Sequence, residues 1–244
     1  MLPRVALVTG AGRRIGASIA QTLHAAGFHV VIHCRTALSE AQALADRLNK
    51  TRVDSACVLT ANLMEHEACV DLVARALAWQ GRLNLLVNNA SLFIRTPFPG
   101  LYEDAWAKMW LTNVNAPFWL SVAAYPALAA QTDGCIINLT DIHAEKPLKD
   151  YGLYCQTKAA LKMQTDVLAM EYAPLVRVNA VAPGAIVWPE ADNALSLATQ
   201  TNIMQKTLLQ CHGDPYWVAT AVLALVENAF ITGQTLRVDG GRVS

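Results

Sequence analysis

Short apolar runs alternate with longer segments of helical period along the chain. The runs predict strands at Val5–Thr9, His29–His33, Ser55–Leu59, Leu83–Asn88, Cys135–Leu139, Arg177–Val181 and Thr235–Val238. Between them, helices are predicted at Ile15–Ala26, Glu40–Lys50, Glu65–Gln80, Asp104–Ala130, Leu153–Ala173 and Pro215–Glu227. Most strand runs are continuously apolar, as expected for strands buried on both faces. The pattern predicts an α/β fold, a doubly wound sheet of seven mostly parallel strands with helices on both faces.

Two local features refine this outline. Ser39, with Gln42 three residues on, predicts a capping box for the second helix. The segment Trp188–Cys211 matches neither a strand nor a strong amphipathic helix, and we expect it to form a lid over the active site. Because no linker-like stretch, low-complexity segment or internal repeat divides the chain, we expect a single domain over residues 1–244.

Composition excludes several classes of protein. The chain has 244 residues, 54% of them hydrophobic, and a formal net charge of zero, which indicates one globular domain with a large apolar core. Nucleic-acid binding is disfavoured because no run of Lys and Arg offers a basic stripe for phosphates. The most apolar stretch, Ala116–Ala130, is interrupted by prolines and is too short to cross a bilayer, so we expect no membrane span.

The six cysteines are scattered, without Cys-x-x-Cys pairs or His/Cys clusters at metal-ligand spacing. We therefore expect no metal site and reduced, mostly buried thiols. Strand-like sequence begins at Arg4 and leaves no room for an export signal before the fold, so we expect the protein in the cytoplasm.

A glycine-rich turn links the first predicted strand to the first helix. Gly10, Gly12 and Gly16 follow the spacing G-x-G-x-x-x-G. Such a turn needs positive φ angles and close backbone approach, and the following helix presents free N–H groups to a pyrophosphate. Glycines at a strand-to-helix turn can also be merely structural, so the motif gains weight only from its context.

The end of the second strand indicates which dinucleotide is bound. An NAD site usually places Asp or Glu there for the ribose 2′-hydroxyl, but this chain has Arg35 and Thr36, preceded by His33. These side chains can pair with a 2′-phosphate, which favours NADP(H). The alternative is a solvated arginine just past a strand, which is disfavoured because no acid stands nearby to bind the 2′-hydroxyl.

Polar residues follow the third and fourth strands, where open α/β sheets bind ligands. Asn62-Leu63 is expected to meet the adenine, and Asn89, Ala90 and Ser91 are expected to line the ribose and nicotinamide side. An Asn-Asn pair is also ordinary turn chemistry, and only its position favours a binding role.

Tyr154 and Lys158 are four residues apart on a predicted helix, so their side chains share one face. An ammonium beside a phenol stabilises the phenolate, and we expect Lys158 to lower the tyrosine pKa so that it can act as acid or base. Such a pair also occurs by chance on solvated helices. Here Asp141 stands thirteen residues before Tyr154, and Asn113 lies within the long preceding helix.

These motifs, taken in order, resemble the short-chain dehydrogenase/reductase family over essentially the whole chain. The resemblance rests on Thr9-Gly10-x-Gly12-x-x-x-Gly16, Asn88-Asn-Ala-Ser91, Asn113, Tyr154-x-x-x-Lys158, Val178-Asn-Ala-Val-Ala-Pro-Gly184, Ile231-Thr-Gly-Gln234 and Val238-Asp-Gly-Gly241. It implies a Rossmann-type fold, an NADP(H)-dependent oxidoreductase and a homotetramer, to which Trp106, Trp110 and Trp119 can contribute unless they are core.

The resemblance also implies residue roles. Tyr154 is the expected proton donor or acceptor, Lys158 binds the nicotinamide ribose, and Asn113 holds a proton-relay water. The remaining expected cofactor contacts, beyond those already given, are Arg13, Arg14, Ile15, Leu139, Thr140, Pro183, Gly184 and Ile186.

Asp141 departs from the common family pattern, which has Ser at this position. A carboxylate beside a carbonyl oxygen opposes the alkoxide that hydride addition creates, so ketone reduction is disfavoured. A C=N bond instead yields a nitrogen that takes up a proton, which Asp141 and Tyr154 can relay. The alternative is that Thr140 or a water replaces the serine and Asp141 is incidental.

With Arg14, Ser91 and Phe93, the aspartate resembles the pteridine reductase branch, which includes dihydromonapterin reductases. That resemblance implies that Phe93 stacks on a pterin, that Arg14 and Ser91 contact pterin and cofactor, and that Asp141 acts with Tyr154. A ring sandwiched between Phe93 and the nicotinamide has its hydride-transfer distance fixed by stacking. We therefore expect NADPH-dependent reduction of a 7,8-dihydropterin. A carbonyl, 3-oxoacyl or hydroxysteroid reductase is the alternative enzyme, and a non-catalytic NADP(H)-binding protein is a further one.

Overall fold

The computed structural model describes residues 3–188 and 195–242. Within them, seven strands form one sheet in the order β3-β2-β1-β4-β5-β6-β7, and every pairing is parallel. The strands are β1 (Val5–Val8), β2 (His29–Cys34), β3 (Ala56–Thr60), β4 (Leu85–Asn88), β5 (Cys135–Leu139), β6 (Arg177–Pro183) and β7 (Thr235–Val238). The strand order reverses between β1 and β4, which is where such sheets bind ligands.

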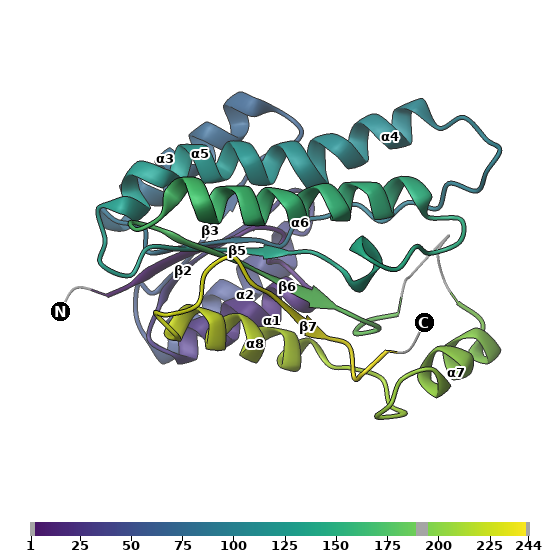
Figure 1. The fold of residues 1–244 in the computed structure, drawn as a ribbon. Helices are drawn as coiled ribbons and strands as arrows, with labels where there is room; N and C mark the ends of the chain where they lie inside the picture. Colours follow the sequence, from purple (N-terminus) through teal and green to yellow (C-terminus); the bar gives the residue numbers. More distant parts are fainter. Residues whose placement is uncertain (1–2, 189–194, 243–244) are drawn as a thin grey trace.

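Helices cover both faces of the sheet (Figure 1). On one face lie α1 (Arg14–Ala25), α2 (Leu38–Thr51) and α8 (Pro215–Glu227). On the other lie α3 (His66–Gln80), α4 (Glu103–Trp110), α5 (Ala116–Ala129) and α6 (Gly152–Tyr172). The expected Rossmann-type architecture is confirmed.

Two apolar cores hold these layers together. Leu23 of α1 and Val222 of α8 belong to the first core, with the strand residue Ile32. Leu72 of α3 and Leu120 of α5 belong to the second, and all five side chains mentioned are 1% exposed or less. Burying a leucine or isoleucine stabilises the fold by about 1.5–3 kcal/mol. The cores therefore fix the strand ends that carry the polar residues.

The predicted helix Asp104–Ala130 is interrupted by the π-helical turn η1 (Leu111–Asn115). Pro117 lies in the first turn of α5 and, lacking an N–H group, cannot donate the α-helical hydrogen bond to the carbonyl of Asn113. The predicted helical segment is therefore confirmed over residues 103–129, with a π-helical turn in its middle that the sequence did not predict. The widened turn contains Asn113, the family's expected relay residue.

One other local prediction needs correction, and a second is tested only in part. The capping box is absent because α2 begins at Leu38 with Ala37 as its N-cap, and the Ser39 hydroxyl instead donates to the Glu40 carboxylate at 2.9 Å. Within Trp188–Cys211, residues Leu197–Gln205 form the helix α7, capped by Ser196. Residues 189–194 of that segment lie outside the described part, and the lid stays a prediction.

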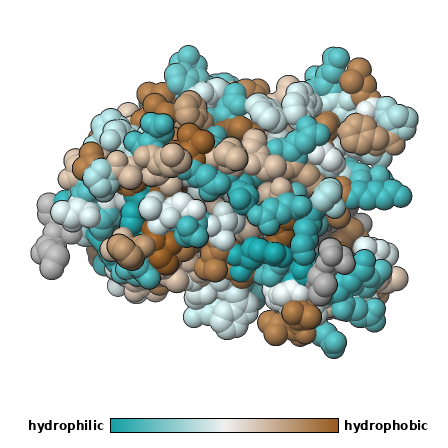
Figure 2. Space-filling model, viewed as in Figure 1, coloured by the Kyte–Doolittle hydropathy of each residue, from teal (hydrophilic) through white to brown (hydrophobic). Residues whose placement is uncertain are grey.

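Surface and cysteine chemistry agree with the sequence where the structure can test them. All six thiols are free, with Cys34, Cys69, Cys135 and Cys155 buried and Cys211 exposed. Among the described residues, the helices are all too short or too polar to span a bilayer. On the face seen in Figure 2, hydrophobic residues are interspersed with hydrophilic ones.

Candidate active site

A large cleft runs along the carboxyl ends of the central strands, with a volume of about 1270 Å³. The glycine-rich turn after β1 forms one end of it. Asp141, Tyr154 and Lys158 line the other end. The fold therefore brings together the two groups of residues that the sequence separates by more than 100 positions.

The glycine-rich turn is shaped for close approach to a ligand. Gly10 has φ +62°, and a Cβ on Gly16 would clash with the Gly10 carbonyl. Gly12 is similarly tight, because its Cβ would lie 3.0 Å from the carbonyl oxygen of Ala37. The turn leads directly into α1, whose first N–H groups have no intrahelical acceptors. These features fit a dinucleotide pyrophosphate.

Asn89 holds this turn in place. Its side-chain amide donates to the carbonyls of Thr9 at 2.8 Å and Gly10 at 3.1 Å. The Thr9 hydroxyl in turn accepts from the backbone N–H groups of Asn89 and Ala90, at 2.9 and 3.0 Å. Asn89 lines the cleft, but its side chain is committed to shaping the turn that the cofactor would contact.

His33 does not have the predicted chemistry of a phosphate partner. The Gly10 N–H donates to its Nδ1 at 3.2 Å, which leaves the proton on Nε2, and Nε2 donates to the Ala61 carbonyl at 3.2 Å. The ring is 1% exposed, and burial lowers the pKa of His33 to about 4. A neutral ring with both nitrogens occupied links the glycine-rich turn to the segment after β3, so the structure contradicts its predicted pairing with a 2′-phosphate.

Cations lie around the same end of the cleft. Arg13, Arg14, Arg35 and Thr36 line it and are exposed, and Arg14 also donates to the Trp188 carbonyl at 2.8 Å. Among the described lining residues the acidic ones are Asp141 and Asp150, and both belong to the far end. The charge distribution therefore suits a polyanionic ligand at the glycine-rich end.

Several further predicted contacts line the cleft. Asn62 does so while its amide donates to the Glu65 carboxylate at 2.6 Å. The others are Ile15, Leu63, Ala90, Ser91, Leu139, Thr140, Pro183, Gly184 and Ile186.

Tyr154 and Asp141 form the central contact of the far end. The tyrosine hydroxyl donates to Asp141 Oδ2 at 2.8 Å, and the His143 N–H donates to Oδ1 at 2.8 Å. Asp141 thereby caps the short 3₁₀-helix η2 (Ile142–Ala144), which fixes its carboxylate. Lys158 donates to the Leu139 carbonyl at 2.8 Å, and its Nζ lies 5.8 Å from the centre of the Tyr154 ring.

Burial determines the protonation of this group. Tyr154 is 5% exposed, and burial together with the Asp141 carboxylate raises its pKa well above 10. Burial lowers the pKa of Lys158 to about 8 against the opposing effect of Asp141. The expectation that Lys158 lowers the tyrosine pKa is therefore wrong for this state of the site. Tyr154 is a neutral phenol, ready to donate a proton.

Asn113 lies behind the site rather than on its wall. Its Oδ1 accepts from the Leu92 N–H at 2.8 Å and the Ser91 hydroxyl at 3.1 Å. Its Nδ2 donates to the Leu92 carbonyl at 2.9 Å and the Thr157 hydroxyl at 3.0 Å. The side chain thus fastens the loop after β4 to α6, and its relay of a proton through a water stays a prediction.

Comparisons with known proteins identify the family. A protein-family model described as short chain dehydrogenase matches residues 4–197 of the sequence. The chain is a short-chain dehydrogenase/reductase. It is 35% identical to a putative ketoacyl reductase 2 of the granaticin polyketide synthase from Streptomyces violaceoruber, over 97% of this chain and 95% of that protein.

Other relatives of this short-chain dehydrogenase/reductase carry different names. Pteridine reductase 1 of Leishmania tarentolae is 33% identical over 97% of this chain and 95% of its own length. L-xylulose reductase of Bos taurus is 34% identical over 98% and 96%. The family binds NAD or NADP and transfers hydride, so the chain is an oxidoreductase. Because relatives with different substrates are about equally identical to this chain, its substrate is argued from its own residues.

The short-chain dehydrogenase/reductase also has cleft residues that the sequence did not single out. Tyr151 is 8% exposed, and its ring stacks on Phe93 with centroids 4.2 Å apart and planes 9° apart. Phe93 meets the Tyr154 ring edge-on at 4.7 Å. Four further residues also line the cleft: Arg95, His143, Lys149 and Asp150. The position of Tyr151, three residues before Tyr154 at the helix start, is the signal that could have revealed it.

Proposed function

We propose that the protein reduces the C=N bond of a 7,8-dihydropterin to give the tetrahydropterin, using NADPH. The observation that carries this proposal is the 2.8 Å hydrogen bond from Tyr154 to Asp141. The common family pattern has a serine hydroxyl at this position, which would lie beside a substrate carbonyl. This site instead has the Asp141 carboxylate, which accepts a hydrogen bond from the protonated Tyr154 phenol. Such a pair suits delivery of a proton to a ring nitrogen.

The alternative reading of Thr140 as a replacement for the family serine is weakened by its geometry. Its hydroxyl donates to the Val181 carbonyl at 3.0 Å and is 4% exposed. Its proton is directed at the sheet, so it is poorly placed to polarise a substrate oxygen. Asp141 is then the polar group at this position. We propose that it accepts the hydrogen bond of the Tyr154 hydroxyl and passes a solvent proton back to Tyr154 after each turnover.

NADPH, when bound, supplies the hydride that the carbon of the C=N bond receives. The nitrogen receives the proton from Tyr154, whose high pKa keeps it protonated until the ring nitrogen becomes basic. Lys158, charged at neutral pH, stabilises the phenolate that remains. A proton taken up from solvent then passes through the Asp141 carboxylate to the phenolate and restores the tyrosine. One hydride and one proton are consumed for each bond reduced.

We propose NADPH rather than NADH because cations stand where the adenosine 2′-phosphate would lie. Arg35 and Thr36 follow β2 and are exposed on the cleft wall, with Arg13 lining the same end. Guanidinium groups bind phosphates through charge-assisted hydrogen bonds. None of the described residues that line that end of the cleft carries a carboxylate for a free 2′-hydroxyl.

Phe93 is proposed to stack on the pterin, with Arg14 and Ser91 contacting both pterin and cofactor. Phe93 is partly exposed in the cleft beside Tyr154, where a flat ring would meet the proton donor. One named relative is a pteridine reductase, which supports the same substrate class.

Ketone reduction is the second candidate, because another relative is named as a ketoacyl reductase at 35% identity. A non-catalytic NADP(H)-binding role is disfavoured by the intact Asp141, Tyr154 and Lys158 group.

We further propose a cytoplasmic homotetramer. Six free thiols suit a reducing compartment. Exposed apolar side chains on α5 and α6, among them Phe118, Val122, Met163 and Met170, offer a face for a second copy. Trp106, Trp110 and Trp119 are partly exposed and remain available to such contacts. Light scattering after size exclusion tests the tetramer, and a monomer contradicts it.

The direct test of the activity is a substrate panel followed by loss of NADPH absorbance. Dihydromonapterin, dihydrobiopterin and dihydrofolate are compared with a 3-oxoacyl thioester and a simple ketone. We expect turnover of dihydropterins, with dihydrofolate the weaker substrate. Turnover confined to the ketones overturns the proposal, and cofactor binding without any oxidation favours the non-catalytic role.

A further inference from the structure

An ion pair lies at the mouth of the cleft, beside the aromatic rings of the catalytic end. Arg95 donates to Asp150 Oδ2 at 2.7 Å, and both residues line the cleft. Arg95 follows Phe93 by two residues, and Asp150 directly precedes Tyr151, the ring stacked on Phe93. The Arg95 side chain is 55% exposed and that of Asp150 is 25% exposed, so the pair lies between the stacked rings and solvent.

The backbone holds this pair in a fixed position. The Thr96 N–H donates to the Asp150 carbonyl at 2.7 Å, which ties the loop after β4 to the loop before α6. Asp150 has φ +67°, a conformation that aspartate and asparagine tolerate better than most residues. An ion pair this exposed contributes little to stability. Its placement on the cleft wall therefore points to recognition.

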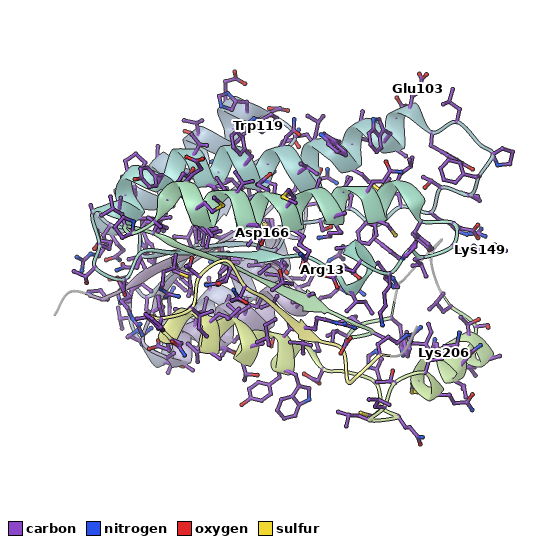
Figure 3. All side chains as sticks on the ribbon, in the orientation of Figure 1. Arg13, Glu103, Trp119, Lys149, Asp166 and Lys206 are labelled. Atoms are coloured by element: carbon purple, nitrogen blue, oxygen red, sulfur yellow. The ribbon has the colours of Figure 1, made fainter. Side chains whose placement is uncertain are left out.

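The chemistry of the pair favours one kind of ligand group. A hydroxyl both donates and accepts, and the pair offers guanidinium N–H donors next to a carboxylate acceptor. The two charges cancel, so the pair has no net attraction for an anion. A carboxylate brought against it would meet Asp150. The cation adjacent in sequence, Lys149, is exposed and lies on the loop ahead of α6 (Figure 3).

We propose that Arg95 and Asp150 form a subsite that reads the substituent of the substrate ring, and that it takes a neutral hydroxylated chain in preference to a carboxylated one. This inference rests on the proposed function, in which the ring lies against Phe93 and receives a proton from Tyr154. The substituent then extends past the stacked rings to the opening. There its hydroxyls accept from Arg95 and donate to Asp150.

The experiment compares kcat/KM for three 7,8-dihydropterins that differ only at C6: a trihydroxypropyl chain, a carboxylate and a methyl group. The methyl compound has no polar substituent and serves as the internal reference. For the unaltered protein we expect the hydroxylated compound to exceed the carboxylated one by about tenfold or more, the effect of losing a charge-assisted hydrogen bond.

Asp150→Asn keeps the shape and the tolerated backbone conformation while removing the negative charge. It should lower kcat/KM for the hydroxylated compound about fivefold to tenfold and raise it for the carboxylated compound about fivefold. The methyl compound should stay within about twofold, because neither group contacts it.

Two control variants bracket this result. Asp71→Asn removes the carboxylate from another exposed pair, Arg75 Nε–Asp71 Oδ2 at 2.7 Å on α3, and should alter none of the three rates. Lys149→Gln should lower kcat/KM only for the carboxylated compound, about twofold to threefold, as expected for a screened surface charge.

Three outcomes overturn the subsite. The first is reduction of all three compounds with a hydroxylated-to-carboxylated ratio that Asp150→Asn leaves unchanged; this spares the proposed function. The second is an equal loss for all three in Asp150→Asn, which makes the residue a support for the aromatic wall. The third is failure of the unaltered protein to reduce any of them, which overturns the proposed function as well.

Discussion

The hydroxyl of Tyr154 donates to the carboxylate of Asp141 at 2.8 Å, joining the first turns of α6 to the end of β5. Because the His143 N–H holds the other carboxylate oxygen, Asp141 is fixed before any substrate arrives. The Tyr154 phenol is consequently kept protonated and held in one orientation by its hydrogen bond to Asp141. In the proposed reduction, this relationship makes Tyr154 the acid, with Lys158 as the nearby cation.

Lys158 predicts the alkaline side of the pH profile. Its pKa, lowered to about 8 by burial, means that the ammonium is lost as pH rises through that value. The kcat/KM for NADPH, which reports the free enzyme, should therefore fall above about pH 8. Tyr154 cannot cause this fall, because its pKa lies well above 10.

The measurement is kcat/KM for NADPH from about pH 6 to about pH 10 at saturating dihydropterin. Lys158→Arg is the companion variant, because a guanidinium keeps its proton over this range. Its residual activity should lack the alkaline fall. A flat profile for the unaltered protein contradicts the assignment.

Arg35 predicts the cofactor preference. Arg35→Glu places a carboxylate where the 2′-phosphate is proposed to lie, and kcat/KM with NADPH should fall about 10–100-fold, the effect of losing a charge-assisted bond and adding repulsion. The rate with NADH should hold or rise, because a carboxylate can accept from the free 2′-hydroxyl.

Arg47→Glu is the matched control for that change. Arg47 is an exposed arginine on α2 that does not line the cleft. Arg47→Glu therefore changes the net charge by the same amount as Arg35→Glu without altering the cleft. Steady-state rates with both cofactors should be unaffected. An equal drop in both arginine variants would attribute the effect to long-range charge and remove Arg35 from the binding site.

His33 predicts a stability that depends on pH. Its folded pKa of about 4 lies below the ordinary 6.5, so the unfolded chain takes up the proton first as pH falls. The contribution is complete above about pH 6.5 and is lost toward about pH 4. At about 1.4 kcal/mol per pKa unit, the loss is roughly 3 kcal/mol.

Urea unfolding at a series of pH values measures this loss. His33→Gln retains a donor and an acceptor but does not titrate, so its free energy of unfolding should fall less between about pH 7 and pH 5. Burial also lowers the pKa values of His24 and His29, and subtracting the two curves leaves the His33 contribution. Parallel curves contradict it.

Much of the fold is predictable from sequence because burial leaves a direct imprint on it. Each predicted strand overlaps an observed one, since continuous apolar runs such as Val5–Val8 are required wherever helices cover both sheet faces. Helix boundaries are less predictable. The π-turn at Asn113 depends on Pro117 and on tertiary packing, and α7 has no buried residues to give it a periodic pattern.

The site divides in the same way. Residues within one motif, such as Tyr154 and Lys158, are found by spacing, and the structure places both in the cleft. Relationships across loops are not visible in sequence: the Phe93–Tyr151 stack joins the loop after β4 to the loop before α6. Protonation also escapes prediction, because His33 and Tyr154 owe their pKa shifts mainly to burial.

The most direct test of the whole account is the ratio of kcat/KM for dihydromonapterin to kcat/KM for a 3-oxoacyl thioester, measured for the unaltered protein and for Asp141→Ser. We predict that the ratio favours the pterin in the first. In the second, pterin turnover should fall about 100-fold, the usual worth of a positioned proton-transfer group, while ketone turnover holds or rises. Asp141→Ser reducing the pterin as well as before, or an unaltered protein that prefers the thioester, would contradict the account.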